Sequence, residues 1–369
     1  MPVVVITDED VRRLLPMRDC IEAMRVGFRD WADGSAVSRP RMRYVAQHKD
    51  AERKYFANVH IGAVPSFGVA VVRAGSHIIK PPSKTVERRL YENPKPANSG
   101  IVVLYSMETA ELIGLMHEFH LSGMRVGATS ALAIDKIARP DASVFGLFGT
   151  GKQARAAFEA IALVRTFRRV NVFSPSREHR EAFAHEMGRG GTEVVAAADP
   201  KAAVEGADVI CCATSSLKPV FDGNWLEDGQ LVVTIANSDV TNPIRRSEVD
   251  RRTYERAHTI IVTDWESVVD GNQLEILEPI AEGLVSRDII HELKDVVADR
   301  IAVKQTSRTD AAQGVIYYKN NAGVALQFAA AGGLVYQRAL AEGKCKMLPS
   351  ELFETDLSAQ YAAGYRPSP

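Results

Sequence analysis

Cysteine is scarce in this chain, which argues against a disulfide framework and against a cysteine metal site. The four cysteines are Cys20, Cys211, Cys212 and Cys345, and their spacing fits neither kind of site. His117 and His120 stand close together, but no third ligand is placed to help them, so no metal is expected. This use of cysteine is typical of a reducing compartment, and we expect a cytoplasmic protein.

An excess of one charge sign and a long apolar run are also missing. The chain has 45 basic and 46 acidic residues and a formal net charge of −1 at pH 7. Without a basic excess or a basic run, neither a nucleic-acid partner nor a membrane-surface partner is expected. No segment has the length of a transmembrane helix, and the N-terminal residues lack the pattern of a signal peptide.

Residues 141–173 show the order strand, glycine turn, helix, strand. The apolar run Val144–Phe148 leads directly into the turn, and residues from Ala154 onward have helical spacing of apolar side chains. In a dinucleotide-binding turn, Gly149 permits the tight bend and Gly151 lets the backbone approach a pyrophosphate. An ordinary turn between strand and helix is the alternative. We predict that the cofactor contacts here come from Gly149, Thr150, Gly151, Lys152 and Gln153.

The end of the second strand, Val170–Phe173, indicates which nicotinamide cofactor binds. An acidic residue at this place usually holds the ribose 2′-hydroxyl of NAD(H), but this chain continues with Ser174, Ser176 and Arg177. Two hydroxyls and a guanidinium suit a 2′-phosphate, so we predict NADP(H), with NAD(H) as the alternative. Ser174 and Ser176 also fit as caps of the helix that begins near Arg177, and the two roles are compatible.

The pattern along the 369 residues predicts an α/β protein of two domains. Helices are expected at 8–15 and 17–31, followed by short β-rich pieces of an antiparallel sheet and by a helix at 122–137. Strands and helices then alternate, which implies a parallel sheet of the Rossmann type. The tail at 321–340 has helical spacing and is expected to return to the first domain. We therefore predict a Rossmann domain at 122–321 and a discontinuous α+β domain at 1–121 and 322–369.

Five segments keep a particular order and spacing between about residues 35 and 340. They are 123–133, FGLFGTGKQA at 145–154, ADVICCATSSLKPV at 207–220, Ala236–Asp239 before Pro243, and 321–325. Together they resemble the ornithine cyclodeaminase and mu-crystallin family of NAD(P)-binding proteins, which act mostly on amino acids and cyclic imino acids. The resemblance implies a Rossmann domain that holds the nicotinamide in a cleft, and a discontinuous substrate domain that pairs in a homodimer.

The resemblance implies two catalytic residues, Arg125 and Asp239. Arg125 matches the arginine that grips the substrate carboxylate, and a guanidinium can do so with a bidentate pair of hydrogen bonds that orients the α-carbon. Asp239 matches the acidic residue beside the nicotinamide, where a carboxylate could exchange a proton with the substrate nitrogen. The alternatives are a surface arginine between the domains and an aspartate that only forms a turn.

The resemblance extends to further residues around the substrate and the cofactor. The motif at 39–43 lies where the family has a basic residue facing the substrate. We choose Arg43 and place Arg41 second, because alternation along a strand puts both on one face; solvated arginines are the alternative. Thr214 and Ser215 resemble the Thr-Ser pair at the cofactor, although hydroxyls also end strands for local reasons. The remaining expected residues are Gly323 for the substrate, and Ala213, Asn237 and Asp239 for the cofactor.

Two positions depart from the family pattern. Ala70 stands where many relatives have a lysine at the substrate carboxylate, and the segment 55–60 lacks the carboxylate that in the cyclodeaminases is matched to the distal amine of ornithine. Both losses argue against ornithine cyclodeamination. Arg73 and His77 could supply a replacement charge at the substrate, while a packed or exposed histidine is the alternative for His77.

These residues together predict an NADP(H)-dependent oxidoreductase, an amino-acid dehydrogenase or imine reductase that interconverts an amine and an imine on a small amino acid or cyclic imino acid. Hydride would pass between the nicotinamide and the α-carbon, Arg125 would hold the carboxylate, and Asp239 would handle the proton. The alternatives are an ammonia lyase that keeps NAD(H) bound and a non-catalytic NADPH-dependent ligand-binding protein. The sequence does not name the substrate, because loops decide the shape of the pocket.

Overall fold

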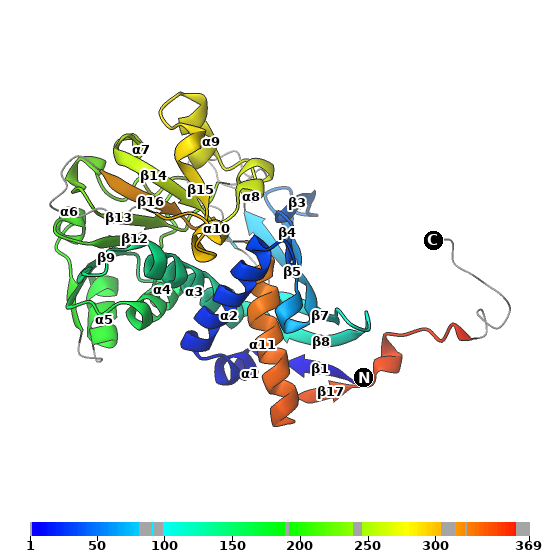
Figure 1. The fold of residues 1–369 in the computed structure, drawn as a ribbon. Helices are drawn as coiled ribbons and strands as arrows, with labels where there is room; N and C mark the ends of the chain where they lie inside the picture. The colour runs from blue at the N-terminus through cyan, green and yellow to red at the C-terminus, as the bar shows by residue number, and fades with distance from the viewer. Residues whose placement is uncertain are drawn as a thin grey trace.

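The computed structural model describes residues 2–80, 90–91, 99–188, 192–238, 246–303, 314–321 and 323–358. Its strands form two sheets, which lie on opposite sides of a group of helices (Figure 1). The α/β fold class that the sequence predicts is confirmed, with a parallel sheet of the Rossmann type as one of the two. No helix in this described part of the chain combines the length and the hydropathy needed to cross a bilayer.

The first sheet comes mainly from the N-terminal third of the chain. Its strands are β1 (Val3–Ile6), β2 (Val37–Ser38), β3 (Met42–Gln47), β4 (Lys54–Val64), β5 (Val69–Lys80), β6 (Leu90–Tyr91), β7 (Ile101–Ser106), β8 (Leu112–His117) and β17 (Lys346–Leu348). They follow the order β17-β1-β8-β7-β5-β4-β2, with β3 paired to β4 and β6 to β5. β1 and β8 run parallel, and the other neighbouring strands run antiparallel.

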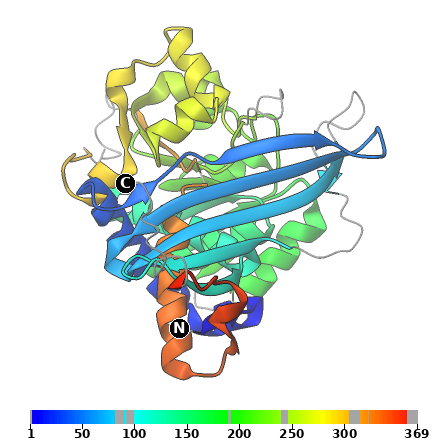
Figure 2. The same ribbon diagram turned by 90° about the vertical axis from the view of Figure 1, so that its right-hand side faces the viewer.

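Helices cover one face of the first sheet and leave the other face open. The main covering helix is α11 (Leu326–Glu342), which packs on β1, β4, β5 and β7; α2 (Met17–Ala32) contacts β4, α1 (Asp8–Leu14) contacts β8, and α3 (Phe119–Ile137) packs on α2 and α11. Figure 2 looks onto the open face, with the long strands in front and the helices behind. α2 buries Cys20, Met24 and Phe28 along one side, which is the spacing of an amphipathic helix. The helix-covered face, called the inner face below, carries the buried polar residues described in the next section.

The second sheet is parallel throughout its described strands. These are β9 (Val144–Phe148), β10 (Arg169–Phe173), β11 (Glu193–Ala196), β12 (Val209–Cys212), β13 (Leu231–Thr234), β14 (Ala257–Val262), β15 (Ile290–Glu292) and β16 (Val315–Lys319). Their order is β11-β10-β9-β12-β13-β16-β14-β15, so the direction of winding reverses between β9 and β12. Ligands of open parallel sheets bind at such a reversal.

Short helices connect the strands of the second sheet. They are α4 (Lys152–Val164), α5 (Arg177–Met187), α6 (Pro200–Val204), α7 (Arg251–Arg256), α8 (Trp265–Asp270), α9 (Leu274–Ala281) and α10 (Leu293–Val297). α4 packs closely on α3, because the backbone of Gly127 lies against the carbonyl group of Ala156, where a side chain on Gly127 would collide. α3 therefore joins the two sheets, with one side on α4 and another on α2 and α11.

The structure differs from the sequence-based expectations where pairing is non-local. β16 lies in the middle of the second sheet, although residues 315–319 were not expected to form a strand; all five are buried, so they show no alternation that would reveal one. α11 begins at Leu326 and not at residue 321. The reason is that the Asn321 side chain accepts hydrogen bonds from the backbone of Thr263 (2.7 Å) and Asp264 (3.1 Å), and Gly323 has φ of +121°.

Candidate functional site

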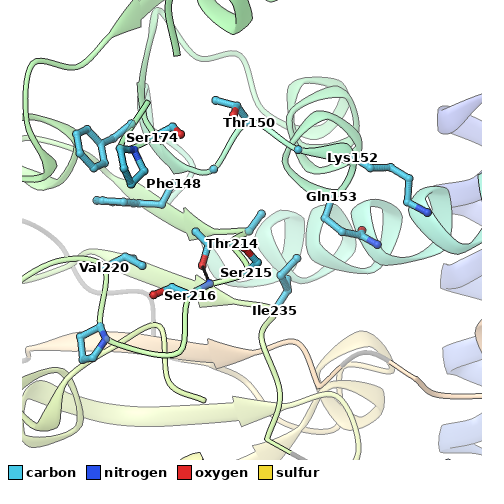
Figure 3. A pocket seen from close by; sticks show the side chains of 16 residues that line it. Phe148, Thr150, Lys152, Gln153, Ser174, Thr214, Ser215, Ser216, Val220 and Ile235 are labelled. Carbon is cyan, nitrogen blue, oxygen red and sulfur yellow. Dashed lines mark hydrogen bonds between the residues drawn. The ribbon is translucent and has the colours of Figure 1, made fainter. Parts of the chain in front are cut away.

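A cavity of about 710 Å³ lies at the carboxyl ends of β9, β10 and β12, where the strand order reverses (Figure 3). Phe148 and Ser174 lie on one side of it, and Lys152 and Gln153 lie on the other. Most of the residues expected at the cofactor line this cavity: Gly149, Thr150, Gly151, Lys152, Gln153, Ser174, Ala213, Thr214 and Ser215. The structure thus brings residues from three segments, 149–153, 174 and 213–215, to one cavity, and their contact with a cofactor stays a prediction.

The glycine turn between β9 and α4 forms one wall of the cavity. Gly149 has φ of +106°, and a side chain there would collide with the carbonyl oxygen of Ala213. A Cβ at Gly151, by contrast, would meet no described atom within 4 Å, because this position opens onto the cavity. Within the described residues, no side chain caps the start of α4. The first N–H groups of α4 are therefore available to an anionic group such as a pyrophosphate.

The three residues predicted at the ribose behave differently from one another. Ser174 lines the cavity, whereas Ser176 and Arg177 do not. Ser176 caps α5 by accepting from the N–H of His179 at 3.2 Å. Arg177 is 80% exposed and forms an ion pair with Glu181 at 2.6 Å. The capping role therefore holds for Ser176, and the geometry does not bring Arg177 to the cavity.

Arg180 is the guanidinium that reaches the end of β10, and the sequence analysis missed it. Its Nη1 donates to the carbonyl oxygen of Ser174 at 2.8 Å, and its guanidinium lies over the ring of Phe173, 5.4 Å from the centroid. The signal that could have found it is helical spacing, because the residue one turn into α5 lies back over the end of β10. No carboxylate is among the described residues that line the cavity.

A buried carboxylate holds the loops that follow β12 and β13. Glu248 accepts from the N–H and the hydroxyl of Thr214 at 2.8 and 2.7 Å, and from the N–H groups of Ile235 at 2.9 Å and Ala236 at 2.8 Å. The Thr214 hydroxyl thus donates to Glu248, while Thr214 still forms part of the cavity wall. Glu248 is far from both loops in sequence and follows no recognisable motif, so sequence reasoning did not find it.

The loop after β13 leads toward Asp239, which lies outside the described residues. Its last described residue, Ser238, donates its N–H to both carboxylate oxygens of Glu275, at 3.0 and 3.1 Å. Glu275 also forms a buried ion pair with Lys319 at 3.3 Å. Burial lowers the pKa of Lys319 while Glu275 opposes that shift. Asn237 belongs to this anchored loop but does not line the cavity.

The inner face of the first sheet carries a patch of polar side chains. Cross-strand pairing places Arg43 opposite Asn58, and His60 opposite Arg73. Directly paired residues share a face, and residues two apart along a strand do so as well, so these four side chains lie on the inner face together. Side chains alternate between the two faces of a strand, and Ala70 is three residues from Arg73, so Ala70 lies on the opposite face. The cation on the inner face of β5 is therefore Arg73.

An ion pair between Arg73 and Glu118 lies within this patch. The Arg73 Nη2 is 2.9 Å from the Glu118 Oε1, both side chains are almost fully buried, and Arg73 also donates to the Asn58 side chain. Two glycines make room for the pair: a Cβ at Gly75 would lie 2.9 Å from the Arg73 guanidinium, and one at Gly100 would collide with Glu118. Burial alone would raise the pKa of Glu118, but Arg73, Arg125 and Lys152 hold it below its ordinary value.

Arg125 reaches the same patch from α3 and is not a surface arginine. It is 6% exposed, donates to the Gln327 Oε1 at 2.5 Å, and lies over the ring of Phe328, 4.5 Å from the centroid. Its Nε is buried and has no hydrogen-bond partner among the described residues. Burial, and next the charge of Arg73, lower the pKa of Arg125. A bound carboxylate would relieve this repulsion.

His60 lies at the centre of the patch, and the sequence analysis missed it. It is 2% exposed, and its ring is 5.3 Å from that of Phe328. Burial, followed by the charges of four arginines, holds the pKa of His60 well below its ordinary value. We refer to these four residues, Arg41, Arg43, Arg73 and Arg125, as the arginine cluster. His77 lies four residue pairs along the strand ladder from His60–Arg73 and is stacked on Phe56, with 6.2 Å between the ring centroids, which fits a packed histidine.

Arg41 and Arg43 contact the edge of the second sheet. Together with Ser238, Asn321 and Gly323 they line a cavity of about 20 Å³. A side chain on Gly323 would lie 2.8 Å from a nitrogen of the Arg41 guanidinium, so the missing side chain makes room for Arg41. The shared face that the sequence predicts for Arg41 and Arg43 agrees with their common position in this cavity.

Lys152 connects the large cavity with the arginine cluster. It lines the cavity, and its Nζ donates to the carbonyl oxygen of Phe119 at 3.1 Å, beside the Glu118 that pairs with Arg73. α3 begins at Phe119 and carries Arg125 two turns further on. A ligand extending from the glycine turn past Lys152 would thus approach the inner face of the first sheet.

Comparison with known proteins agrees with this geometry. The model of the ornithine cyclodeaminase/mu-crystallin family matches residues 2–343. The chain is 24% identical to the alanine dehydrogenase of Archaeoglobus fulgidus over 343 residues, 93% of this chain and 97% of that protein. It is 24% identical to a Δ1-pyrroline-2-carboxylate reductase of Bacillus cereus over 341 residues, 92% of this chain and 97% of that protein.

A solved structure shares the fold over nearly the whole chain. It is the Δ1-pyrroline-2-carboxylate reductase of Thermococcus litoralis in complex with NADH and L-proline. The two chains are 23% identical and superimpose with a TM-score of 0.77, covering 93% of this chain and 99% of the other. At this identity the likeness establishes the architecture, and the chemistry has to be argued from the residues of this chain.

Proposed function

Because the chain belongs to the ornithine cyclodeaminase/mu-crystallin family, we propose that it is an NADP(H)-dependent oxidoreductase that interconverts an amine and an imine on a small amino acid or cyclic imino acid. The observation that carries this proposal is the approach of two sites to each other. Lys152 lines the cavity that has the glycine turn and the uncapped helix start, and it lies near enough to Glu118 and Arg125 for their charges to act on its pKa. The related alanine dehydrogenase and pyrroline-carboxylate reductases act on substrates of this class.

The residues of the cavity fit a dinucleotide. The space at Gly151 and the N–H groups at the start of α4 suit a pyrophosphate, and the bound cofactor would supply or accept the hydride. In the oxidative direction the substrate would give up a hydride from its α-carbon and a proton from its nitrogen, which leaves a carbon–nitrogen double bond; the bound cofactor would supply the hydride acceptor. Arg125 would hold the substrate carboxylate and Asp239 would take the proton. Glu248 and Glu275 would position the loops that carry these contacts.

NADP(H) is the proposed cofactor in preference to NAD(H). Among the described residues that line the cavity there is no carboxylate where NAD(H) enzymes hold the ribose 2′-hydroxyl, and Ser174 lies at the end of β10 with the Arg180 guanidinium beside it. A 2′-phosphate placed there would accept charge-assisted hydrogen bonds from this guanidinium. Arg180 thus takes the role that the sequence analysis gave to Arg177.

We also propose that the protein forms a homodimer through the open face of the first sheet (Figure 2). Apolar side chains are exposed on this face, among them Ile61 at 41% and Tyr105 at 38%. Exposed apolar patches of this kind mark protein interfaces. Light scattering should give twice the monomer mass for the wild type and the monomer mass for Ile61→Asp. A wild-type monomer would refute this part of the proposal.

A screen of amino and imino acids with NADP⁺ and NADPH tests the proposed activity. The measurement is the absorbance of the reduced nicotinamide, together with free ammonia. We expect a stoichiometric change in NADPH with a carboxylate-bearing amine or imine. Ammonia release without a net change in NADPH would indicate a cyclodeaminating lyase, and tight NADPH binding without turnover of any amino or imino acid would indicate a ligand-binding protein.

A further inference from the structure

His60 is a buried polar side chain whose nitrogens have no partner in the described chain. Neither ring nitrogen accepts or donates a hydrogen bond within the described residues, although the side chain is 2% exposed. Its contact with the Phe328 ring fixes the plane of the imidazole without satisfying its nitrogens. Leaving such a group unsatisfied is costly, and it is retained where a ligand completes the hydrogen bonds. His60 therefore marks a place where a ligand binds.

The arginine cluster surrounds His60 from two sides. Arg73 lies directly across the strand pair, and Arg125 lies over the same Phe328 ring, so these two form one side. Arg41 and Arg43 form the other side, next to the small cavity with Gly323 and the Ser238 loop. All four charges act on the imidazole and keep it neutral. A neutral imidazole can donate a hydrogen bond between two cationic sides without adding to their repulsion.

Two guanidinium groups of the cluster, those of Arg73 and Arg125, retain donors although they already have partners. An arginine has five N–H donors, and one ion pair does not use them all. Arg73 illustrates this, because it pairs with Glu118 and donates to Asn58, and its buried Nε still has no hydrogen-bond partner in the described part of the chain. The Nε of Arg125 is likewise buried and has no hydrogen-bond partner among the described residues. One carboxylate takes a single bidentate fork, so a site with guanidinium groups on two sides suits two carboxylates.

We propose that the substrate is a dicarboxylate, an α-amino or α-imino acid with a second carboxylate; this rests on the proposed oxidoreductase function. Arg125, with Arg73 beside it, binds the α-carboxylate. Arg41 and Arg43 bind the second carboxylate, and His60 donates an N–H to the substrate between them. The site thus selects against basic amino acids such as ornithine, whose distal ammonium group would face arginines.

Equilibrium binding to the complex of the protein with NADP⁺ tests the substrate class. The probes are glutamate and glutamine, and aspartate and asparagine, each in both enantiomers, because the members of each pair differ by one charge at nearly constant shape. Titration calorimetry should give about 10- to 100-fold tighter binding for the acid than for its amide in at least one pair. Equal affinities, or tighter binding of the amides, would overturn the proposal.

Three variants assign the preference to residues. Arg43→Gln should weaken binding of the acid about tenfold more than binding of the amide, because only the acid loses a charge-assisted pair; Arg41→Gln repeats the test if Arg43→Gln does not fold. His60→Phe keeps a ring against Phe328, removes both nitrogens, and should weaken binding of the acid about tenfold. Arg39→Gln is the matched control, because Arg39 is 68% exposed and its pair with Glu266 is long at 3.6 Å. It should preserve the preference.

The outcomes separate this inference from the proposed function. If Arg43→Gln and Arg41→Gln weaken acid and amide equally, all the arginines serve a single carboxylate and the inference is wrong. If NADP⁺ is reduced with a monocarboxylate amino acid and with neither acid, the proposed function stands and the inference fails. If no amino or imino acid is turned over, the proposed function fails, and the binding comparison still decides the charge preference of the site.

Discussion

The cofactor cavity and the arginine cluster lie next to each other, yet different kinds of residue form them. The cavity wall combines glycines and short hydroxyl side chains with apolar residues such as Phe148 and Ile235, and two continuous segments, 149–153 and 213–216, supply most of it. The arginine cluster is made of long charged side chains from β3, β5, α3 and the residues just before β3. The comparison teaches that the first site depends on local backbone geometry, and the second depends on how distant elements pair.

The largest expected effect concerns Asp239, the proposed proton carrier of the reaction. Asp239→Asn keeps the shape and removes the proton carrier, so turnover should fall by about 10²- to 10⁴-fold, as for the loss of a general acid or base. NADPH affinity should stay within a few-fold of the wild type, because only the chemical step loses a group. Near-normal turnover would show that water or another residue transfers the proton and that Asp239 only forms a turn.

The next prediction separates the two glycines of the turn. Gly151→Val should lower NADPH affinity by about 100-fold or more and leave the melting temperature nearly unchanged, because the new side chain enters the cavity and not the protein. Gly149→Val should instead lower the melting temperature, since Gly149 has positive φ and no room beside Ala213. Fluorescence titration and thermal unfolding of both variants make the comparison. Normal NADPH binding by Gly151→Val would show that the turn is purely structural.

A smaller effect decides which guanidinium meets the 2′-phosphate. Arg180→Ala should cost about 1.5–3 kcal/mol of NADPH binding, the usual range for a hydrogen bond to a charged group, and leave NADH binding unchanged. Arg177→Ala serves as the control, because that side chain is exposed and paired with Glu181. The measurement is the ratio of NADPH to NADH affinity for each variant. If Arg177→Ala lowers the ratio and Arg180→Ala does not, the roles are reversed.

The smallest effect concerns His60 and pH. Its folded-state pKa lies well below the unfolded value of 6.5, so only the unfolded chain takes up a proton as the pH falls below 6.5. His60 then costs up to about 1.4 kcal/mol of stability per pH unit. Between pH 6.5 and 5.5 the wild type should lose stability faster than His60→Asn, in which this titration is absent. Parallel losses in urea unfolding would contradict a neutral, buried His60.

The difference between the two regions also explains what could be predicted from the sequence. The glycine turn is contiguous, so its strand, its bend at Gly149 and its helix were all predicted correctly, while the approach of a pyrophosphate at Gly151 stays a prediction. Arg125 was found through a family motif, and its burial agrees with a role in the site. Arg41 and Arg43 were placed on one face by strand alternation alone. In each case the information lies within a few residues of the side chain concerned.

What was missed depends on partners distant in sequence. His60 joins Arg73 only through the register of β4 and β5, and Glu118 meets Arg73 only because Gly75 and Gly100 leave space for the pair. Glu248 accepts hydrogen bonds from N–H groups of loops that precede it by 12 to 34 residues. No local period encodes such contacts, because hydrogen bonding of buried groups is settled only after the elements pack.

Transfer of an isotope tests the central claim most directly. The protein is incubated with NADP⁺ and an amino acid substrate carrying deuterium on its α-carbon, and the mass of the released reduced cofactor is measured. The account predicts that the deuterium appears in NADPH in amounts equal to the imine or keto product, because the hydride passes once from the α-carbon to the nicotinamide. Release of ammonia with the deuterium retained in the amino acid product, and no net NADPH, would contradict it.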